Sequence, residues 1–280
     1  AADVEFDIAG LGDDFLWTTE LLYVDRQDAA FWLDQSRFKT DQTVEGRTIW
    51  SNIYGAENRW DIQLTNSKDS GESTIITTGL NKAWDNGTVL NMSYSHQNIT
   101  ETNPGNTSTA EASYFDEVII NRNSPLKGRA FYEVEHRFVV NLGYQQEFFE
   151  GYNTSFNLFW ERRSGRPFSW TLGREARTDF GDQRSNTRVY LPYLPQSATD
   201  PAFDFSVLSY QQIMAIAQDA GVAQYAGAYI PKYAGTQPWL TTMDLSITQE
   251  LPGLTKNHKG QLYFIIDNLA NLINDDWGKS

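Results

Sequence analysis

The chain of 280 residues contains no cysteine and only three histidines. Without cysteine it has neither a disulfide scaffold nor a thiolate metal site. The histidines, His96, His136 and His258, are scattered along the chain, which argues against a histidine-rich metal site. We therefore expect no metal and no other cofactor.

Positive charge and long apolar runs are also scarce. The chain has 22 Lys and Arg against 36 Asp and Glu, for a net charge of -14. It lacks the basic stripe that neutralises phosphates, so we expect no nucleic-acid partner. No segment approaches the roughly 18 apolar residues of a membrane helix. Because the chain starts without Met, we expect it to be a piece of a longer protein.

Aromatic residues are plentiful, at 14% of the chain, and they occur in alternating patterns. In the stretch 132–149, YEVEHRFVVNLGYQQEFF, every second residue is apolar or aromatic and the residues between are mostly polar or charged. Side chains on a strand point alternately to opposite faces. The stretch is therefore predicted to be one long strand with an apolar face and a wet face.

The same alternation predicts about eight long strands in all. An interruption at SKDSGES (67–73) is either a bulge or a separate turn. A helix is expected within 206–221, beginning at Ser206 as N-cap, ending at Gly221 and packing Leu208, Ile213 and Ile216 on its own loop. The strands are expected at 3–9, 15–26, from about 60 to 84, around 90–95, 132–149, around 155–161, 239–250 and 261–267.

The connections between these strands alternate between short and long. Short turns are expected at LGDD (11–14), DNG (85–87), EGYN (150–153) and PGLTKNHKG (252–260). Long polar loops cover about 34–58, 101–127 and 173–237. Short turns at one end and long loops at the other are typical of a transmembrane β-barrel. The predicted fold is an all-β, antiparallel transmembrane β-barrel segment with short periplasmic turns and long extracellular loops.

In such a barrel the apolar positions face lipid and the polar positions face a water-filled lumen. The aromatics fit two interfacial girdles, with Trp17, Trp84 and Phe148 near the short turns and Tyr23, Tyr94, Tyr132, Trp160 and Trp239 toward the long loops. The residues predicted to face lipid are Phe138, Val140, Leu142, Phe156, Leu158, Leu245, Ile247, Leu262, Phe264 and Ile266. The residues predicted to face the lumen are Glu133, Glu135, Arg137, Glu161 and Arg163.

Six phrases also occur in a familiar order and together cover nearly the whole chain. They are TNPGNTSTAEAS (102–113), NSPLKGRAFYEVEHRFVVNLGYQQEFF (123–149), TSFNLFWERRSGRPFSWTLG (154–173), RVYLPYLP (188–195), QPWLTTMDLSITQELP (237–252) and LYFIIDNLANLINDDWG (262–278). Through them the chain resembles the C-terminal barrel of TonB-dependent outer-membrane receptors of the Oar-like, OmpA-related type.

The resemblance implies a function and a set of partners. Such receptors have a barrel of about 22 strands around an N-terminal plug, and the TonB complex pulls on the plug to energise uptake. Residues 1–280 would then be a partial barrel in the outer membrane of a Gram-negative bacterium, with the plug and the final strand absent. The implied partners are outer-membrane lipid, the protein's own plug, the TonB complex and an unidentified extracellular substrate.

The charged residues of the central strands have two interpretations. In a receptor they could line the transport path or meet the plug. They also fit a network of solvated lumen charges, worth a fraction of a kcal/mol per pair. The pair Glu133 and Glu135 lies side by side rather than across a scissile bond, so we expect no enzyme. DFGDQRSN (179–186) shares letters with calcium loops but not their spacing, which leaves calcium in the third long loop as an alternative.

Two other classes of protein fit the same strand pattern. A passive porin or an adhesive surface barrel would use this fold without energy coupling, and upstream sequence would distinguish it by the lack of a plug. A soluble β-sandwich that binds carbohydrate through exposed aromatics would instead pack its apolar faces together.

Overall fold

The computed structural model describes residues 2–8, 12–55, 57, 59–68, 70–105, 107–173, 180–181, 189–255 and 258–272. It confirms an all-β, antiparallel chain dominated by one large sheet. The eight long strands of that sheet follow one another in the order β1-β2-β7-β8-β10-β11-β14-β15, and the short β9 pairs with β8. Their bounds are β1 Ala2–Ile8, β2 Gly12–Asp25, β7 Glu72–Ala83, β8 Thr88–Glu101, β9 Gly128–Arg129, β10 His136–Phe149, β11 Tyr152–Arg163, β14 Leu240–Pro252 and β15 Lys259–Ile266.

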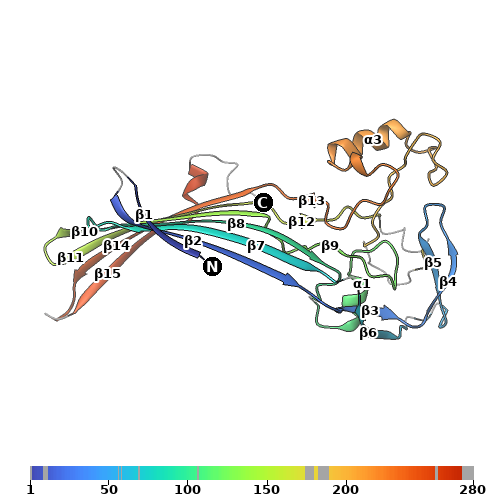
Figure 1. Cartoon of the computed structure of the whole chain (residues 1–280), viewed down its shortest axis with the longest axis horizontal. Coiled ribbons are helices and arrows are strands. Elements are labelled where there is room, and N and C mark those ends of the chain that lie inside the picture. Colours follow the sequence, from blue (N-terminus) through green and yellow to red (C-terminus); the bar gives the residue numbers. More distant parts are fainter. Residues whose placement is uncertain are drawn as a thin grey trace.

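The connections of this sheet are asymmetric. The connections β1–β2, β7–β8, β10–β11 and β14–β15 are short and lie at one end of the long strands, at the left in Figure 1. The connections β2–β7, β8–β10 and β11–β14 are long and lie together at the other end, where they form the loop layer. The alternation of short and long connections predicted from the sequence is therefore present.

Glycine sets the geometry of two of the short turns. Gly87, in the turn between β7 and β8, has a φ of +83°, and Gly151, between β10 and β11, has a φ of +79°. Both values lie in the left-handed region, which costs glycine little. Gly87 is also tightly placed, because its carbonyl accepts from the Gln145 amide of β10 at 2.9 Å.

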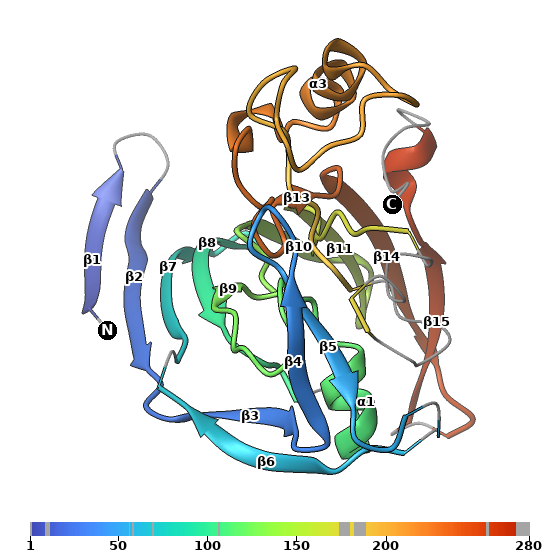
Figure 2. The same cartoon turned by 90° about the vertical axis from the view of Figure 1, so that its right-hand side faces the viewer.

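The sheet is open. Viewed from the loop layer, it forms a curved arc whose two ends are β1 and β15 (Figure 2). Within the described residues β1 and β15 pair with one neighbour each, and no closed barrel forms. Unpaired strand edges expose backbone hydrogen-bonding groups, which proteins normally cover or pair.

The loop layer has secondary structure that the sequence patterns did not predict. The first long loop contains two small sheets, one pairing β3 with β6 and one pairing β4 with β5. The interruption at 67–73 is therefore a separate turn between β6 and β7 rather than a bulge. The remaining elements are β3 Ala29–Asp34, β4 Arg37–Gln42, β5 Thr48–Asn52, β6 Ile62–Ser67, α1 Ala110–Phe115, β12 Pro167–Phe168, α3 Tyr210–Asp219, η1 Ala223–Tyr225, β13 Gly235–Thr236 and η2 Leu269–Leu272.

The expected helix is present but begins later than predicted. Its N-cap is Ser209, not Ser206, because Ser209 forms a reciprocal capping box with Gln212. The prediction for its packing was wrong for Leu208 and Ile216, which are exposed; Ile213 is half-buried, and the buried residue of α3 is Ala217. None of the described helices is long and apolar enough to cross a membrane.

The hydrophobic core lies in the loop layer and not on the sheet. One buried cluster contains Ile119, Phe180, Val189 and Tyr190, and a second centres on Leu194, with Ala217, Val222 and Ile230. Among the described residues, the buried apolar side chains of the eight long strands are only Phe15 and Ile99. A sheet in a soluble domain buries at least one apolar face, and this sheet does not.

Candidate functional site

The register of the strands sorts the side chains of the sheet into two faces. Leu142 of β10 lies opposite Leu90 of β8 and Leu158 of β11, and Leu158 lies opposite Leu245 of β14. In the adjacent register position, Asn141 of β10 lies opposite Asn91 of β8 and Phe159 of β11. Directly paired residues point to the same side of a sheet, so an apolar face and a polar face extend across these strands.

The apolar face contains all ten positions predicted to face lipid. Direct pairing links them from β10 to β15: Tyr144–Phe156–Ile247–Phe264 forms one row, and Leu142–Leu158–Leu245–Ile266 forms the next. Leu262, Phe138 and Val140 continue the same alternation along β15 and β10. None of these side chains is buried: Leu262 is 60% exposed, Phe264 57% and Leu142 40%, and most of the others are half-buried.

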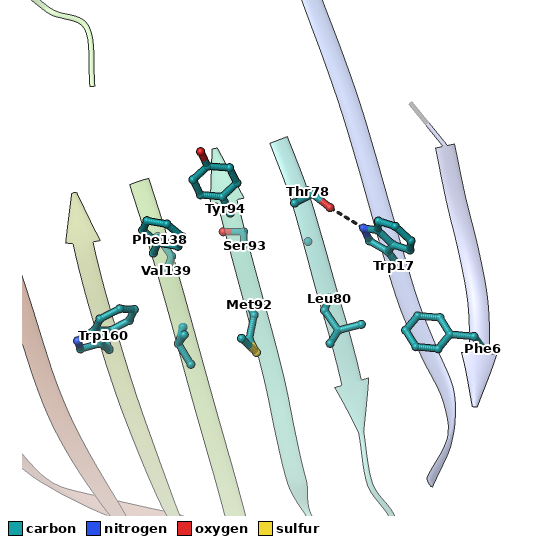
Figure 3. Close-up of a pocket in the computed structure, with 12 residues that line it drawn as sticks. Phe6, Trp17, Thr78, Leu80, Met92, Ser93, Tyr94, Phe138, Val139 and Trp160 are labelled. Carbon is teal, nitrogen blue, oxygen red and sulfur yellow. Dashed lines mark hydrogen bonds between the residues drawn. The ribbon is translucent and has the colours of Figure 1, made fainter. Parts of the chain in front are cut away.

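A shallow groove of about 500 Å³ lies on the apolar face. Figure 3 shows side chains from six neighbouring strands around it, from Phe6 on β1 to Trp160 on β11. The Trp17 indole N–H donates to the Thr78 hydroxyl, so these polar groups satisfy each other. The groove therefore offers hydrocarbon and aromatic surface to whatever lies against this face, which suits an apolar chain.

At the loop end the groove meets a row of stacked rings. The Tyr94 ring centroid lies 4.7 Å from that of Phe138, and the Tyr94 hydroxyl is 2.9 Å from Nδ1 of His136. His136 stacks between His96, at 4.9 Å, and Trp239, at 6.0 Å. Amphipathic rings of this kind suit a boundary between an apolar and an aqueous region.

The polar face contains three of the five residues predicted to face a lumen. Arg137 lies directly opposite Arg163, and Glu161 follows on the same face of β11. The Arg137 Nε lies 2.5 Å from a Glu161 carboxylate oxygen, and the Arg163 Nε lies 3.7 Å from the other. A carboxylate between two arginines offsets their repulsion, so the three residues form a cross-strand charge network.

The predictions for Glu133 and Glu135 as strand residues were wrong. β10 begins at His136, and residues 131–135 form a turn before it. Glu133 is buried: one carboxylate oxygen accepts from the Ile99 amide at 2.6 Å, and the other pairs with Arg129. Glu135 also binds Arg129, at 3.0 Å. Alternation alone did not reveal this turn, because the turn residues happen to continue the period of two.

The loop layer is held together by a buried arginine that the sequence did not point to. Arg47, between β4 and β5, donates at 2.6 Å to the carbonyl of Ile120 in the second long loop and to that of Leu191 in the third. Its guanidinium carbon lies 4.4 Å from the ring centroid of Phe180 and 4.9 Å from that of Tyr229. One side chain thus connects all three long loops.

A buried ion pair makes a second connection. The Lys232 ammonium pairs with Glu117 and donates at 2.8 Å to the carbonyl of Thr102. Burial raises the pKa of the Glu117 carboxyl to about 7, and the charge of Lys232 opposes that shift. Neither residue stands in a recognisable motif, so the pair could not be predicted from the sequence.

A cavity of about 390 Å³ lies beside this pair in the loop layer. Its lining includes three cationic residues, and each has an acidic partner: Lys127 pairs with Glu72 at 3.5 Å, Arg129 with Glu133 and Glu135, and Lys232 with Glu117. Tyr225, Tyr229 and Tyr233 supply ring surface. The cavity is suited to holding a small polar molecule by non-covalent contacts.

A metal site would need several His, Asp or Glu side chains close together among the described residues. No group of three or more His, Cys, Asp and Glu side chains is placed to hold a metal ion within those residues. The calcium-like segment 179–186 lies outside the described residues, except for Phe180 and Gly181.

Comparisons with known proteins found no matching family model, no similar curated protein and no similar solved structure.

Proposed function

We propose that the sheet is a segment of a transmembrane β-barrel in the outer membrane of a Gram-negative bacterium. The observation that carries the proposal is the open apolar face. Eight antiparallel strands expose residues such as Trp17 (50%), Leu21 (63%) and Phe264 (57%), whereas the core lies in the loops. In lipid that face is solvated by acyl chains, and closure with further strands would satisfy the edges of β1 and β15.

Within this barrel we assign the chain to a receptor that takes up an extracellular substrate with energy relayed by TonB. The loop layer supports the receptor part of this assignment, since long loops with their own core and a cavity form a structured surface for a ligand. The TonB part rests on the six sequence phrases. The barrel performs no chemistry in this proposal and provides the wall, the ligand-facing loops and the seat for a plug.

The two parts are tested separately, with the whole protein in its own cell. Membrane insertion predicts that it sediments with the outer membrane and that detergent, but not high salt or carbonate, extracts it. Extraction without detergent would overturn the barrel assignment. Energy coupling predicts that substrate accumulation stops when TonB is deleted or the proton-motive force is collapsed. Uptake that persists under both treatments would instead identify a passive barrel.

A further inference from the structure

Arg162 is a charged residue that lies on the apolar face of the sheet. It lies directly opposite Phe138 of β10 and Thr241 of β14, and therefore points to the side occupied by Trp160 and Leu158 of its own strand. Its side chain is exposed. Within the described part of the chain, Arg162 has no carboxylate partner within 4.0 Å. A charge on a mostly apolar surface needs a solvating partner.

The described side chains around Arg162 are an aromatic ring and polar groups that already have other partners. Its guanidinium carbon lies 5.5 Å from the ring centroid of Trp239, in the row of stacked rings at the loop end of the apolar face. The nearby imidazoles have protein partners already: His96 donates to the Glu135 carbonyl at 3.0 Å, and His136 binds Tyr94. Glu135 itself is engaged by Arg129, with His136 Nε2 at 3.6 Å.

Another cation on the apolar face, Lys82, differs in an informative way. Lys82, which lies near the short turns, is directly opposite Leu90 and donates to the carbonyl of Asp13. It therefore has a partner within the protein. Arg162 lies at the opposite end. Its planar guanidinium makes no hydrogen bond to any described residue, and its donors can bind two oxygens of one phosphate side by side.

The groove on the apolar face begins next to Arg162. Phe138, the direct partner of Arg162, lines the groove, and so does Trp160, two residues before Arg162 on β11. The groove then continues away from the loops past Met92 and Leu80 (Figure 3). A cationic group at the rim with an apolar groove beneath it matches an amphiphile that has a phosphate head and a hydrocarbon tail.

We propose that this face binds an anionic membrane lipid, with its phosphate on Arg162 beside Trp239 and an acyl chain along the groove. The inference rests on the proposed insertion of the sheet into a membrane. Charge complementarity selects the headgroup, and the groove, whose lining is mainly apolar and aromatic, selects the tail.

The test is native mass spectrometry of the whole protein in detergent, with phosphatidylglycerol and phosphatidylcholine of identical acyl chains. The wild-type protein should retain phosphatidylglycerol about tenfold more strongly, as expected for one charge-assisted contact. Arg162→Gln should remove this preference. The matched control, Arg163→Gln, changes the adjacent arginine on the opposite face and should keep it. Leu80→Trp, which fills the groove, should lower retention of both lipids.

Three outcomes would overturn the proposal. A wild-type protein without preference between the lipids would do so whatever the variants show. An equal preference for phosphatidylglycerol in the wild-type protein and in Arg162→Gln would show that Arg162 does not bind the headgroup. Displacement of the lipid by inorganic phosphate would identify a simple anion site. Each of these results leaves barrel insertion intact, whereas a protein that stays in solution without detergent would overturn insertion itself.

Discussion

Lys232 and Glu117 form an ion pair between two long loops in which the side chains are 0% and 8% exposed. The pair joins segments that lie 115 residues apart in the sequence. Because burial raises the pKa of Glu117 to about 7, the stability of the loop layer should depend on pH.

The direction of that dependence follows from proton binding. Between pH 4.5, the ordinary pKa, and about 7, the folded state holds a proton on Glu117 that the unfolded state has lost. Stability from this group should therefore fall as pH rises through that window, by on the order of 1 kcal/mol per pH unit at most.

Amide hydrogen exchange in the loop layer measures this dependence of stability on pH. Glu117→Gln should flatten the slope, and Glu57→Gln, at an exposed carboxylate, should leave it unchanged; a persisting slope in Glu117→Gln would assign it to other groups.

A second prediction concerns Arg47. Arg47→Met should destabilise the loop layer by about 3 kcal/mol, because two buried carbonyls lose a charged donor and the ring contacts lose their cation. Faster amide exchange in segments 118–122 and 189–194 would report the loss. Arg59→Met provides the control, since Arg59 is exposed and stacks on Tyr54 at 4.1 Å. Equal effects of the two variants would refute a connecting role for Arg47.

A third prediction uses the two glycine turns. Alanine at either position incurs strain from positive φ, but a Cβ at Gly87 would also lie 2.1 Å from the Gln145 carbonyl, whereas one at Gly151 has no atom within 4 Å. Gly87→Ala should therefore reduce the folded fraction far more than Gly151→Ala. Heat-modifiable electrophoresis of the whole protein from membranes separates folded from unfolded barrels. Similar losses in both variants would show that the clash has no effect on assembly.

A fourth prediction separates the two faces. Val140→Arg should impair assembly by about 2–4 kcal/mol if position 140 lies near the bilayer midplane, whereas Asn141→Arg should be tolerated because its neighbours Asn91 and Phe159 lie on the polar face. The amount of folded protein in outer membranes measures both. Equal tolerance would count directly against lipid on the apolar face.

The sequence predicted the sheet well because period-two alternation is a local signal. It placed Phe138, Val140 and Leu142 on one face, and the register agrees. Glu133 shows the limit of that signal, since a turn just before β10 continued the same alternation while the chain left the sheet.

The loop layer was far less predictable. The contacts that organise it, Arg47 with Leu191 and Lys232 with Glu117, join residues more than 100 positions apart. No local pattern records such pairings. Arg162 lies just beyond the strand predicted around 155–161, and its place on the apolar face became clear only from the register with β10 and β14.

The most direct test of the membrane assignment is a nitroxide scan along β10. The chain contains no cysteine. A nitroxide label attached to a single cysteine introduced at each of positions 138 to 145 of the whole, membrane-inserted protein would therefore have no competing labelling site in residues 1–280. Positions 138, 140, 142 and 144 should show high accessibility to oxygen, which concentrates in lipid, and positions 139, 141, 143 and 145 should favour a water-soluble nickel complex. Low accessibility to both reagents at the even positions, as in a packed soluble core, would contradict the assignment.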